Sequence, residues 1–139
     1  MNGFLLVSAG GRPIGIPLEY LEAVTETGSC SPVPSSEPAV RGVATVRGTT
    51  VPVVHLATLL TGGAMPAERG ETAILVSIAG RLVCLEVDDA DVVVYEPAMP
   101  VPPDAAMPWA RAVVRRPDGL VPLLDLSALG ARLMETGTG

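Results

Sequence analysis

The sequence contains an internal repeat, and this repeat limits the folds that the chain can adopt. The stretch RGVATVRGTTVPVVHLATLL at residues 41–60 is matched without a gap by RAVVRRPDGLVPLLDLSALG at residues 111–130. Each copy reads as an apolar strand, a turn with glycine, a second strand that contains proline, and a short amphipathic helix. Duplication of such a unit predicts two related β modules.

The repeat extends upstream of these two stretches. Three further matches are Leu-Val-Ser at 6–8 and 75–77, Gly-Arg at 11–12 and 80–81, and Val24 with Val93. The chain then reads twice as strand, turn, strand, strand, proline-rich loop, strand, turn, strand and helix, and five short strands per half suffice for one small β-barrel. We therefore predict one mainly β domain over residues 1–139, with repeat halves at about 4–60 and 73–130 joined by a loop at 61–72.

Two barrels of this size are expected to depend on each other. A barrel of fewer than about 70 residues is marginal alone, so the halves should share an apolar interface. Hydrophobic residues make up 48% of the chain and aromatic residues only 3%, which predicts a core of Val, Leu, Ile and Ala. The repeat does not decide whether strands cross from one half to the other.

The charge of the chain argues against several classes of partner. The net charge is −6 and there is no lysine, so the chain lacks the basic stripe that favours nucleic acids and anionic membranes. The N-terminal residues lack the basic start and long apolar run of a signal peptide. No stretch approaches the roughly 18 apolar residues of a membrane span. We expect a cytoplasmic protein that does not bind nucleic acid and does not insert directly into a membrane.

Residue types that carry catalysis are sparse and lie apart in the sequence. The single histidine, His55, occupies the position of Asp125 in the second copy, and both side chains suit the cap of a following helix. Cys84 lies in an expected strand without an adjacent base, so we interpret it and Cys30 as free thiols. The sequence contains no nucleophile elbow, no P-loop and no dinucleotide-binding glycine motif. We expect no enzymatic activity, no metal site and no cofactor.

Acidic side chains cluster once, between two expected strands. Asp88, Asp89 and Asp91 follow the strand expected at Leu82–Val87, but they lack the glycine turn and the distal glutamate of a calcium loop. A solvated acidic turn is therefore favoured over a cation site. Within the preceding strand, Glu86 is expected to face water.

Arg47 is the charged residue with two open interpretations. It ends the strand expected at Val43–Arg47, before a turn expected at Gly48–Thr50. An exposed arginine at a turn can be a simple surface residue. A guanidinium fork on a long apolar stem also suits the core of a protein interface, so Arg47 is equally a candidate for binding a partner.

The sequence as a whole resembles the CheW family of chemotaxis coupling proteins. The resemblance rests on FLLVSAGGRPIGIPLEYLEAV near the start, VPSSEPAVRGVATVRGTTVPVVHLATLL in the middle, and ILVSIAGRLVCLEVDDADVV followed by GLVPLLDLSALG later in the chain. It covers about residues 4–130. It implies two SH3-like β-barrels packed side by side, in agreement with the repeat.

The resemblance also implies a function and a set of partners. Members of the family are non-enzymatic adaptors that couple the cytoplasmic tip of methyl-accepting chemoreceptors to the regulatory domain of CheA-type histidine kinases, at membrane-associated receptor arrays. Receptor helices are expected to lie in an apolar groove between the barrels. The implied partner-binding positions are the arginine linked to receptor coupling, its two flanking glycines, and two leucines in the early contact segment: Arg47, Gly42, Gly48, Leu18 and Leu21.

Four residues depart from the family's pattern. Thr45-Val46 stands where the family has Asn-Leu, His55 where it has Asp, and Cys84 where it has Gly. The alternative is a divergent CheW-like binding module of another chemosensory or regulatory pathway, which keeps only one of the two interfaces. A small-molecule or peptide-sensing SH3-like module outside chemotaxis is a further alternative.

Overall fold

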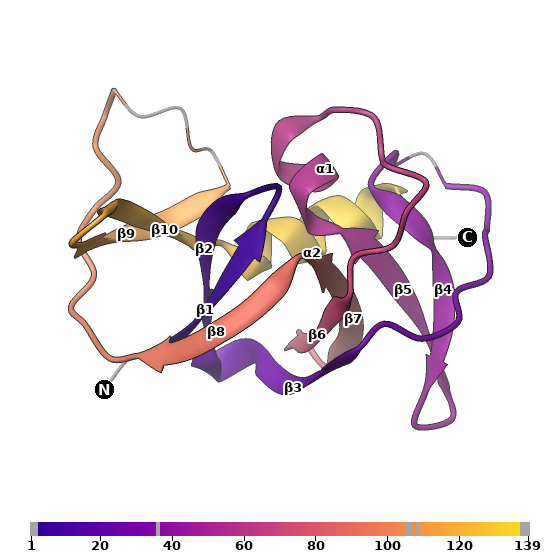
Figure 1. Cartoon of the computed structure of the whole chain (residues 1–139). Helices are drawn as coiled ribbons and strands as arrows, with labels where there is room; N and C mark the ends of the chain where they lie inside the picture. Colours follow the sequence, from indigo (N-terminus) through magenta and orange to yellow (C-terminus); the bar gives the residue numbers. More distant parts are fainter. Residues whose placement is uncertain (1–2, 36, 105–106, 108, 137–139) are drawn as a thin grey trace.

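The computed structural model describes residues 3–35, 37–104, 107 and 109–136, and its strands form two five-stranded sheets that lie side by side (Figure 1). One sheet, lobe A, has the order β8 (Asp89–Val94), β1 (Phe4–Ala9), β2 (Arg12–Pro17), β10 (Gly119–Leu124), β9 (Ala110–Arg116). The other sheet, lobe B, has the order β3 (Leu21–Glu26), β6 (Thr72–Ile78), β7 (Arg81–Val87), β5 (Thr49–His55), β4 (Val40–Val46). The helices are the 3₁₀-helix η1 (Leu18–Tyr20), α1 (Leu56–Thr61) and α2 (Leu126–Thr136). The predicted mainly β fold with two SH3-like five-stranded units is confirmed, although each unit is an open sheet.

Each lobe is built from strands of both repeat halves. β1 and β2 come from the first half but join β8, β9 and β10 of the second, while β6 and β7 come from the second half but join β3, β4 and β5 of the first. The junction between halves is a parallel pairing in both lobes, with Leu123 beside Gly15 and Val53 beside Cys84. Every strand of lobe A has its repeat counterpart at the same place in lobe B. The leading hairpins of the two halves are therefore exchanged.

Three of the four hairpins close through two-residue turns with positive φ at both residues, namely Gly10-Gly11, Arg47-Gly48 and Ala79-Gly80. Such type I′ turns have a twist that matches the paired strands. The fourth turn contains Pro117, whose ring does not allow positive φ, so the counterpart of the Arg47 turn has another shape. The turn predicted at Gly48–Thr50 begins one residue earlier, because Thr49 already pairs with Val46.

One apolar core joins the two lobes. It contains buried aliphatic residues from both sheets and both helices, among them Val7, Ile16, Ile74, Leu85, Leu56 and Leu126. Smaller clusters fill each lobe, around Phe4 in lobe A and around Val53 in lobe B. Burial of one Leu or Ile side chain contributes about 1.5–3 kcal/mol, so the shared core links the stability of one lobe to that of the other. This is the apolar interface that the repeat predicts.

Two of the differences between observed and predicted element boundaries concern the acidic residues after β7 and the C-terminal helix. β8 begins at Asp89, before the strand that the sequence predicts at Val92–Tyr95, because Asp89 pairs with Ser8. The three acidic residues are exposed as predicted, but only Asp88 lies in a bend, whereas Asp89 and Asp91 belong to the strand. α2 continues to Thr136, although the sequence predicts a tail from Met134, and the rest of that tail at 137–139 lies outside the described residues. In the part of the chain that is described, no helix is long and apolar enough to cross a membrane.

Candidate binding surfaces

The β4–β5 hairpin carries Arg47 at its tip. Arg47 has φ 52° and its side chain is 60% exposed. Its Nη1 lies 3.6 Å from Oε1 of Glu22 on β3. Because β3 and β4 are the two edge strands of lobe B, this ion pair spans the open side of the lobe. An exposed pair of this kind contributes at most about 1 kcal/mol, which leaves the guanidinium available to a partner.

The two glycines near Arg47 have different roles. Gly48 has φ 75° and nothing lies within 4 Å of the place its Cβ would take, so the turn conformation is what favours glycine there. Gly42 is buried in β4, and a Cβ there would lie 2.2 Å from the carbonyl oxygen of Ser31. Ser31 and Val43 exchange backbone hydrogen bonds of 2.8 and 2.9 Å. Gly42 thus lets the proline-rich segment lie directly on β4.

Leu18 and Leu21 lie on the crossover from lobe A to lobe B. Leu18 opens η1 and Leu21 opens β3, and both are half-buried against the shared core. The backbone N–H of Leu18 donates to the carbonyl oxygen of Gly3 at 3.0 Å, which ties this residue to the start of lobe A. Leu21 precedes Glu22, the ion-pair partner of Arg47. Leu21 is therefore next in sequence to the residue that contacts Arg47, whereas Leu18 is tied to the other lobe.

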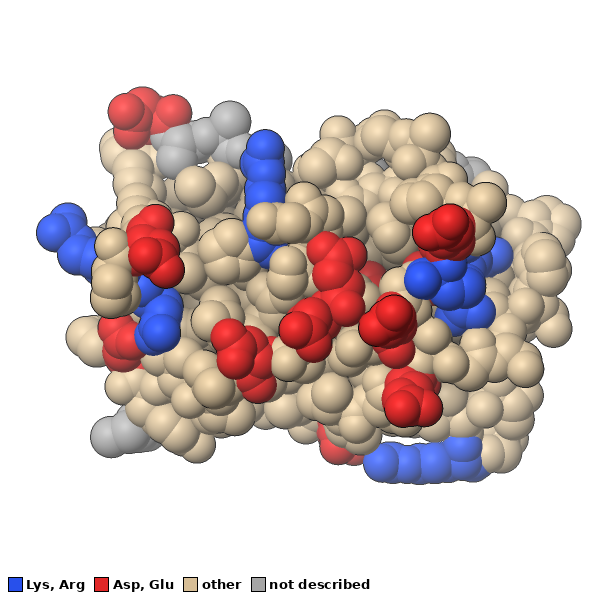
Figure 2. All heavy atoms as spheres, in the orientation of Figure 1, with Lys and Arg blue, Asp and Glu red and all other residues tan. Residues whose placement is uncertain are grey.

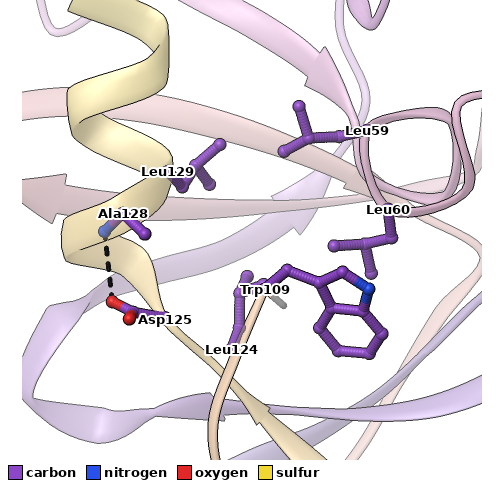
Figure 3. Close-up of a pocket in the computed structure, with 7 residues that line it drawn as sticks. All are labelled: Leu59, Leu60, Trp109, Leu124, Asp125, Ala128 and Leu129. Carbon is purple, nitrogen blue, oxygen red and sulfur yellow. Dashed lines mark hydrogen bonds between the residues drawn. The ribbon is translucent and has the colours of Figure 1, made fainter. Parts of the chain in front are cut away.

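A mainly apolar hollow of about 260 Å³ lies where α1 and α2 meet (Figure 3). It is lined by α1, α2 and adjoining residues of lobe A: Leu59, Leu60, Trp109, Leu124, Asp125, Ala128 and Leu129. Leu59 and Leu129 are repeat counterparts, so the hollow lies between the two equivalent helices. Trp109 stands at the position that Ala39 has in the first half, and its indole forms a wall beside Leu60. The hollow therefore has a large aromatic surface on one side only.

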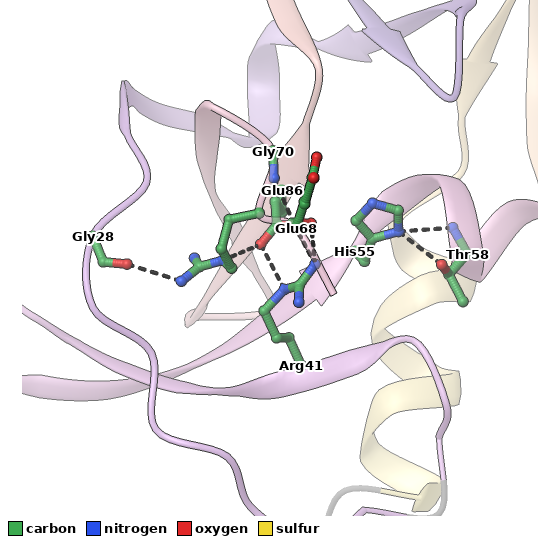
Figure 4. A network of polar contacts seen from close by, with 8 residues as sticks. Gly28, Arg41, His55, Thr58, Glu68, Gly70 and Glu86 are labelled. Carbon is green, nitrogen blue, oxygen red and sulfur yellow. Dashed lines mark hydrogen bonds and ion pairs between the residues drawn. The ribbon is translucent and has the colours of Figure 1, made fainter. Parts of the chain in front are cut away.

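Equivalent side chains cap the two helices beside this hollow. His55 Nδ1 accepts a hydrogen bond from the backbone N–H of Thr58 at 3.3 Å, and Asp125 Oδ1 accepts one from Ala128 at 3.1 Å (Figures 3 and 4). Burial lowers the pKa of His55 from its ordinary value of 6.5, which keeps Nδ1 free to accept at neutral pH. The prediction that these two residues are helix caps is confirmed.

Glu86 on β7 is buried, so the prediction that it faces water is wrong (Figure 4). Its Oε1 accepts hydrogen bonds from Arg41 Nη2 at 2.7 Å and from the Gly70 amide at 2.9 Å. Its Oε2 accepts from Arg41 Nε at 2.9 Å and from Arg69 Nε at 2.6 Å. Two counter-charges and four hydrogen bonds stabilise a carboxylate that is otherwise costly to bury.

The same arginines fasten two loops to lobe B. Arg69 Nη1 donates to the carbonyl oxygen of Gly28 at 3.0 Å, and Arg41 Nη2 donates to that of Glu68 at 3.2 Å. Burial by itself raises the pKa of Glu86, but the hydrogen bonds that the carboxylate accepts outweigh burial and hold the pKa below its usual value. Both carboxylate oxygens are occupied, so this network is structural and offers no site for a ligand.

The remaining candidates for chemistry are not assembled into a reactive site. Among the described residues, no three His, Cys, Asp or Glu side chains are placed to hold a metal ion. Cys84 is buried in lobe B beside the half-buried Cys30, and burial raises the pKa of Cys84 to about 11. Its thiol is therefore protonated at neutral pH and a poor nucleophile. The surface at Arg47 and the hollow between α1 and α2 are suited to binding, through an exposed guanidinium and apolar contact.

The sequence predicted an apolar groove between the barrels through the family resemblance, but it did not predict the residues that line the hollow or the Glu86 network. The signal for the hollow lay in the repeat, because the only tryptophan, Trp109, aligns with the small residue Ala39. The network had no local signal, since Arg41 and Glu86 are 45 residues apart.

Comparison with known proteins identifies the relatives of this double lobe. A family model described as CheW-like domain matches residues 3–133. Among solved structures, the chain is similar to the scaffolding protein TtCheW from Thermoanaerobacter tengcongensis, with a TM-score of 0.81 and 20% sequence identity over 92% of this chain and 91% of that chain. At this identity the similarity shows a shared fold. No curated protein matches the chain.

Proposed function

This chain belongs to the CheW-like family, whose model matches residues 3–133, and from that premise we propose that it is a non-enzymatic adaptor coupling chemoreceptors to a CheA-type histidine kinase. Its partners are then the cytoplasmic tip of a methyl-accepting receptor and the regulatory domain of the kinase. This role places the protein in the cytoplasm, at membrane-associated receptor arrays.

The observation that supports the proposal is that two separate surfaces suited to binding lie on one joined core. The first lies on η1 and the start of β3, with Leu18 and Leu21. The second is the hollow between α1 and α2, with Trp109 as one wall. A protein that bridges two partners needs two surfaces at a fixed separation, and the core shared by the lobes supplies that separation.

The hollow suits an amphipathic helix from the receptor tip. Helix-in-groove recognition places apolar side chains of one helix face into an apolar depression, and the hollow offers Leu60 and Trp109 to such side chains. Tryptophan is enriched among the residues that dominate binding energies. Asp125 at the rim already caps α2, so recognition in the hollow rests on shape and apolar contact.

The exposed guanidinium of Arg47, at the tip of the β4–β5 hairpin, supplies the charged contact. In this proposal Arg47 contributes to receptor coupling, while Leu18 and Leu21 are apolar contacts for the kinase. Gly48 acts through the turn that presents Arg47. Gly42 is buried, so it acts on binding only by positioning β4.

Binding to the two partner fragments tests the proposal. We expect the full chain to retain both a CheA regulatory domain and a receptor-tip fragment from the same organism in pull-down experiments. Arg47→Ala should weaken receptor binding several-fold and shift the melting temperature by less than about 4 °C, because its ion pair is exposed. Arg115→Ala is the matched control, since Arg115 is exposed on β9 and belongs to none of the ion pairs of the described residues.

The outcomes separate the alternatives. Binding to neither fragment would sink the proposal. Binding to one fragment only would identify a divergent adaptor that keeps one of the two interfaces. A large loss of stability in Arg47→Ala would show that this arginine is structural.

A further inference from the structure

The edges of the two sheets are protected unequally. The edge strands β4 and β9 each pair with a residue of a proline-rich loop, through the bridges Ser31–Val43 and Met99–Val113. The opposite edges, β3 and β8, have no further strand beside them in the described chain. Val24 on β3 and Val93 on β8 are repeat counterparts, and they are 46% and 45% exposed. An open edge with exposed apolar side chains is a surface to which another strand can add.

The two open edges differ in their balance of charge. On β3, Glu22 lies 3.6 Å from Arg47. On β8, the residue at the position of Glu22 is Asp91, whereas Pro117 stands at the position of Arg47. None of the ion pairs formed by described residues includes Asp91 or Asp89. In lobe A the arginine beside Pro117, Arg116, pairs instead with Glu96 after the end of β8, so the described residues leave Asp91 without an ion-pair partner.

Space for a basic side chain lies beside β8. A hollow of about 220 Å³ lies between the β1–β2 hairpin and the start of β8, bordered by Leu6, Ser8, Pro13, Asp89 and Asp91. Figure 2 shows carboxylates gathered over the middle of the face on which β8 lies. The side chain of an arginine suits this hollow in charge and in its apolar stem.

We propose that the free edge of β8 binds an extended, basic segment of a partner protein. The segment adds as a strand along β8, and one of its arginine or lysine side chains enters the hollow beside Asp91 and Asp89. Apolar contacts along the edge come from Val92, Val93 and Tyr95, which are 51%, 45% and 59% exposed. The arginine or lysine of the partner then lies beside Asp91 as Arg47 lies beside Glu22 in lobe B.

A second copy of the chain is not the favoured occupant. Its own open edges carry Glu22 and Asp91, and its net charge is −6, so edge-to-edge contact would bring like charges together. The β8 surface is also separate from the Arg47 edge and from the hollow between α1 and α2. The inference therefore stands or falls independently of the proposed coupling of receptor and kinase.

The test uses the full chain and two synthetic peptides. One peptide alternates arginine with valine, and the other carries glutamate in place of every arginine. Each is titrated at low salt into the ¹⁵N-labelled chain, and amide shifts are followed by NMR. We expect the arginine peptide to shift residues of β8 and of the β1–β2 hairpin, and the glutamate peptide to shift neither.

Two matched variants separate a local contact from a general attraction between opposite charges. Asp91→Arg should weaken binding of the arginine peptide about tenfold, because it places a like charge in the hollow. Asp104→Arg makes the same change of net charge on an exposed loop and should alter the affinity less than about twofold. If Asp91→Arg does not fold, Asp91→Asn should weaken binding by about threefold.

Several results would overturn the proposal. These are equal loss of affinity in Asp91→Arg and Asp104→Arg, shifts centred on β3 or another element, and equal binding of the glutamate peptide. Concentration-dependent shifts of β8 without any peptide would show instead that a second copy occupies the edge.

Discussion

Replacement of Glu86 by glutamine tests whether the buried network holds lobe B together. The substitution preserves the shape of the side chain, removes its charge and turns one acceptor atom into a donor. Arg41 and Arg69, whose side chains are 11% and 29% exposed, then lose their counter-charge. Removal of one partner from a buried ion pair costs about 3–5 kcal/mol, because the remaining charge is desolvated without compensation.

The partial exposure of Arg69 sets the expected loss near the lower end of that range. Arg69 can turn toward water, so we expect Glu86→Gln to lower the free energy of unfolding by about 3 kcal/mol. For a domain of this size the loss corresponds to about 10 °C in melting temperature. It is a large part of a total stability of about 5–15 kcal/mol.

Urea unfolding followed by far-UV circular dichroism measures this loss. The matched control is Glu19→Gln, because Glu19 pairs at 2.8 Å with Arg111, the repeat counterpart of Arg41. That pair is exposed, with side-chain exposures of 34% for Arg111 and 59% for Glu19, so its loss should cost less than about 1 kcal/mol. A loss in Glu86→Gln no larger than that in Glu19→Gln would refute the reasoning.

The effect of Glu86→Gln should also depend on pH. The pKa of Glu86 is lowered in the folded state, so the carboxylate contributes its full stabilisation above the unfolded pKa of about 4.3. This contribution is lost as the pH falls through the lower folded value. The difference in stability between wild type and variant should therefore be constant near neutral pH and should narrow below about pH 4.

Three further predictions concern buried and half-buried positions of lobe B. Gly42→Ala should lower the free energy of unfolding, measured with urea, by at least about 2 kcal/mol, because the new Cβ would lie 2.2 Å from the Ser31 carbonyl oxygen. Gly28→Ala, where nothing lies within 4 Å of the new Cβ, should be nearly neutral, and equal effects of the two substitutions would contradict this reasoning. His55→Ala should cost about 1 kcal/mol by removing the cap of α1. The pKa of His55 is lowered in the folded state, so the stabilisation by the cap should be present above the unfolded pKa of about 6.5 and lost as the pH falls through the folded value. A difference in melting temperature between wild type and His55→Ala that grows in acid would argue against the cap. Iodoacetamide at about pH 8 should modify Cys30 in the folded chain and Cys84 only after unfolding, because burial raises the pKa of Cys84 to about 11. Mass spectrometry measures the order of modification, and modification of Cys84 before Cys30 would contradict the burial of the Cys84 thiol.

The pairing within each hairpin could be predicted from the sequence, but the exchange of hairpins could not. Turns such as Arg47-Gly48 fix which residues face each other over a few positions, and this information is local. The exchange depends on Gly15 lying beside Leu123 in a parallel pairing between remote segments. Because the two halves are similar, a hairpin fits its own half or the other half equally well by its local pattern.

Glu86 shows why one buried polar feature of lobe B escaped prediction. In a strand that alternates between a buried and a solvent-exposed face, a charged residue indicates the solvent-exposed face. β7 lies between β6 and β5, and every residue from Val83 to Val87 is buried, so neither side of that stretch is wet. The charge is instead satisfied by Arg41 and Arg69, which come from distant segments. Arg47 was easier to single out as a candidate, because its place at the tip of a hairpin follows from a local turn.

During synthesis of the chain, the strands of the exchanged hairpins are made at different times. All strands of lobe B lie within residues 21–87, so this lobe can close while the rest of the chain is still on the ribosome. The β1–β2 hairpin leaves the ribosome before the strands of lobe B, yet it acquires its parallel neighbour only after β10 has been made. Until then Ile14 and Ile16, which are buried in the finished protein, lack part of their cover. A nascent chain that stalls before β10 presents a closed lobe B together with an uncovered apolar hairpin, which is a surface that chaperones bind.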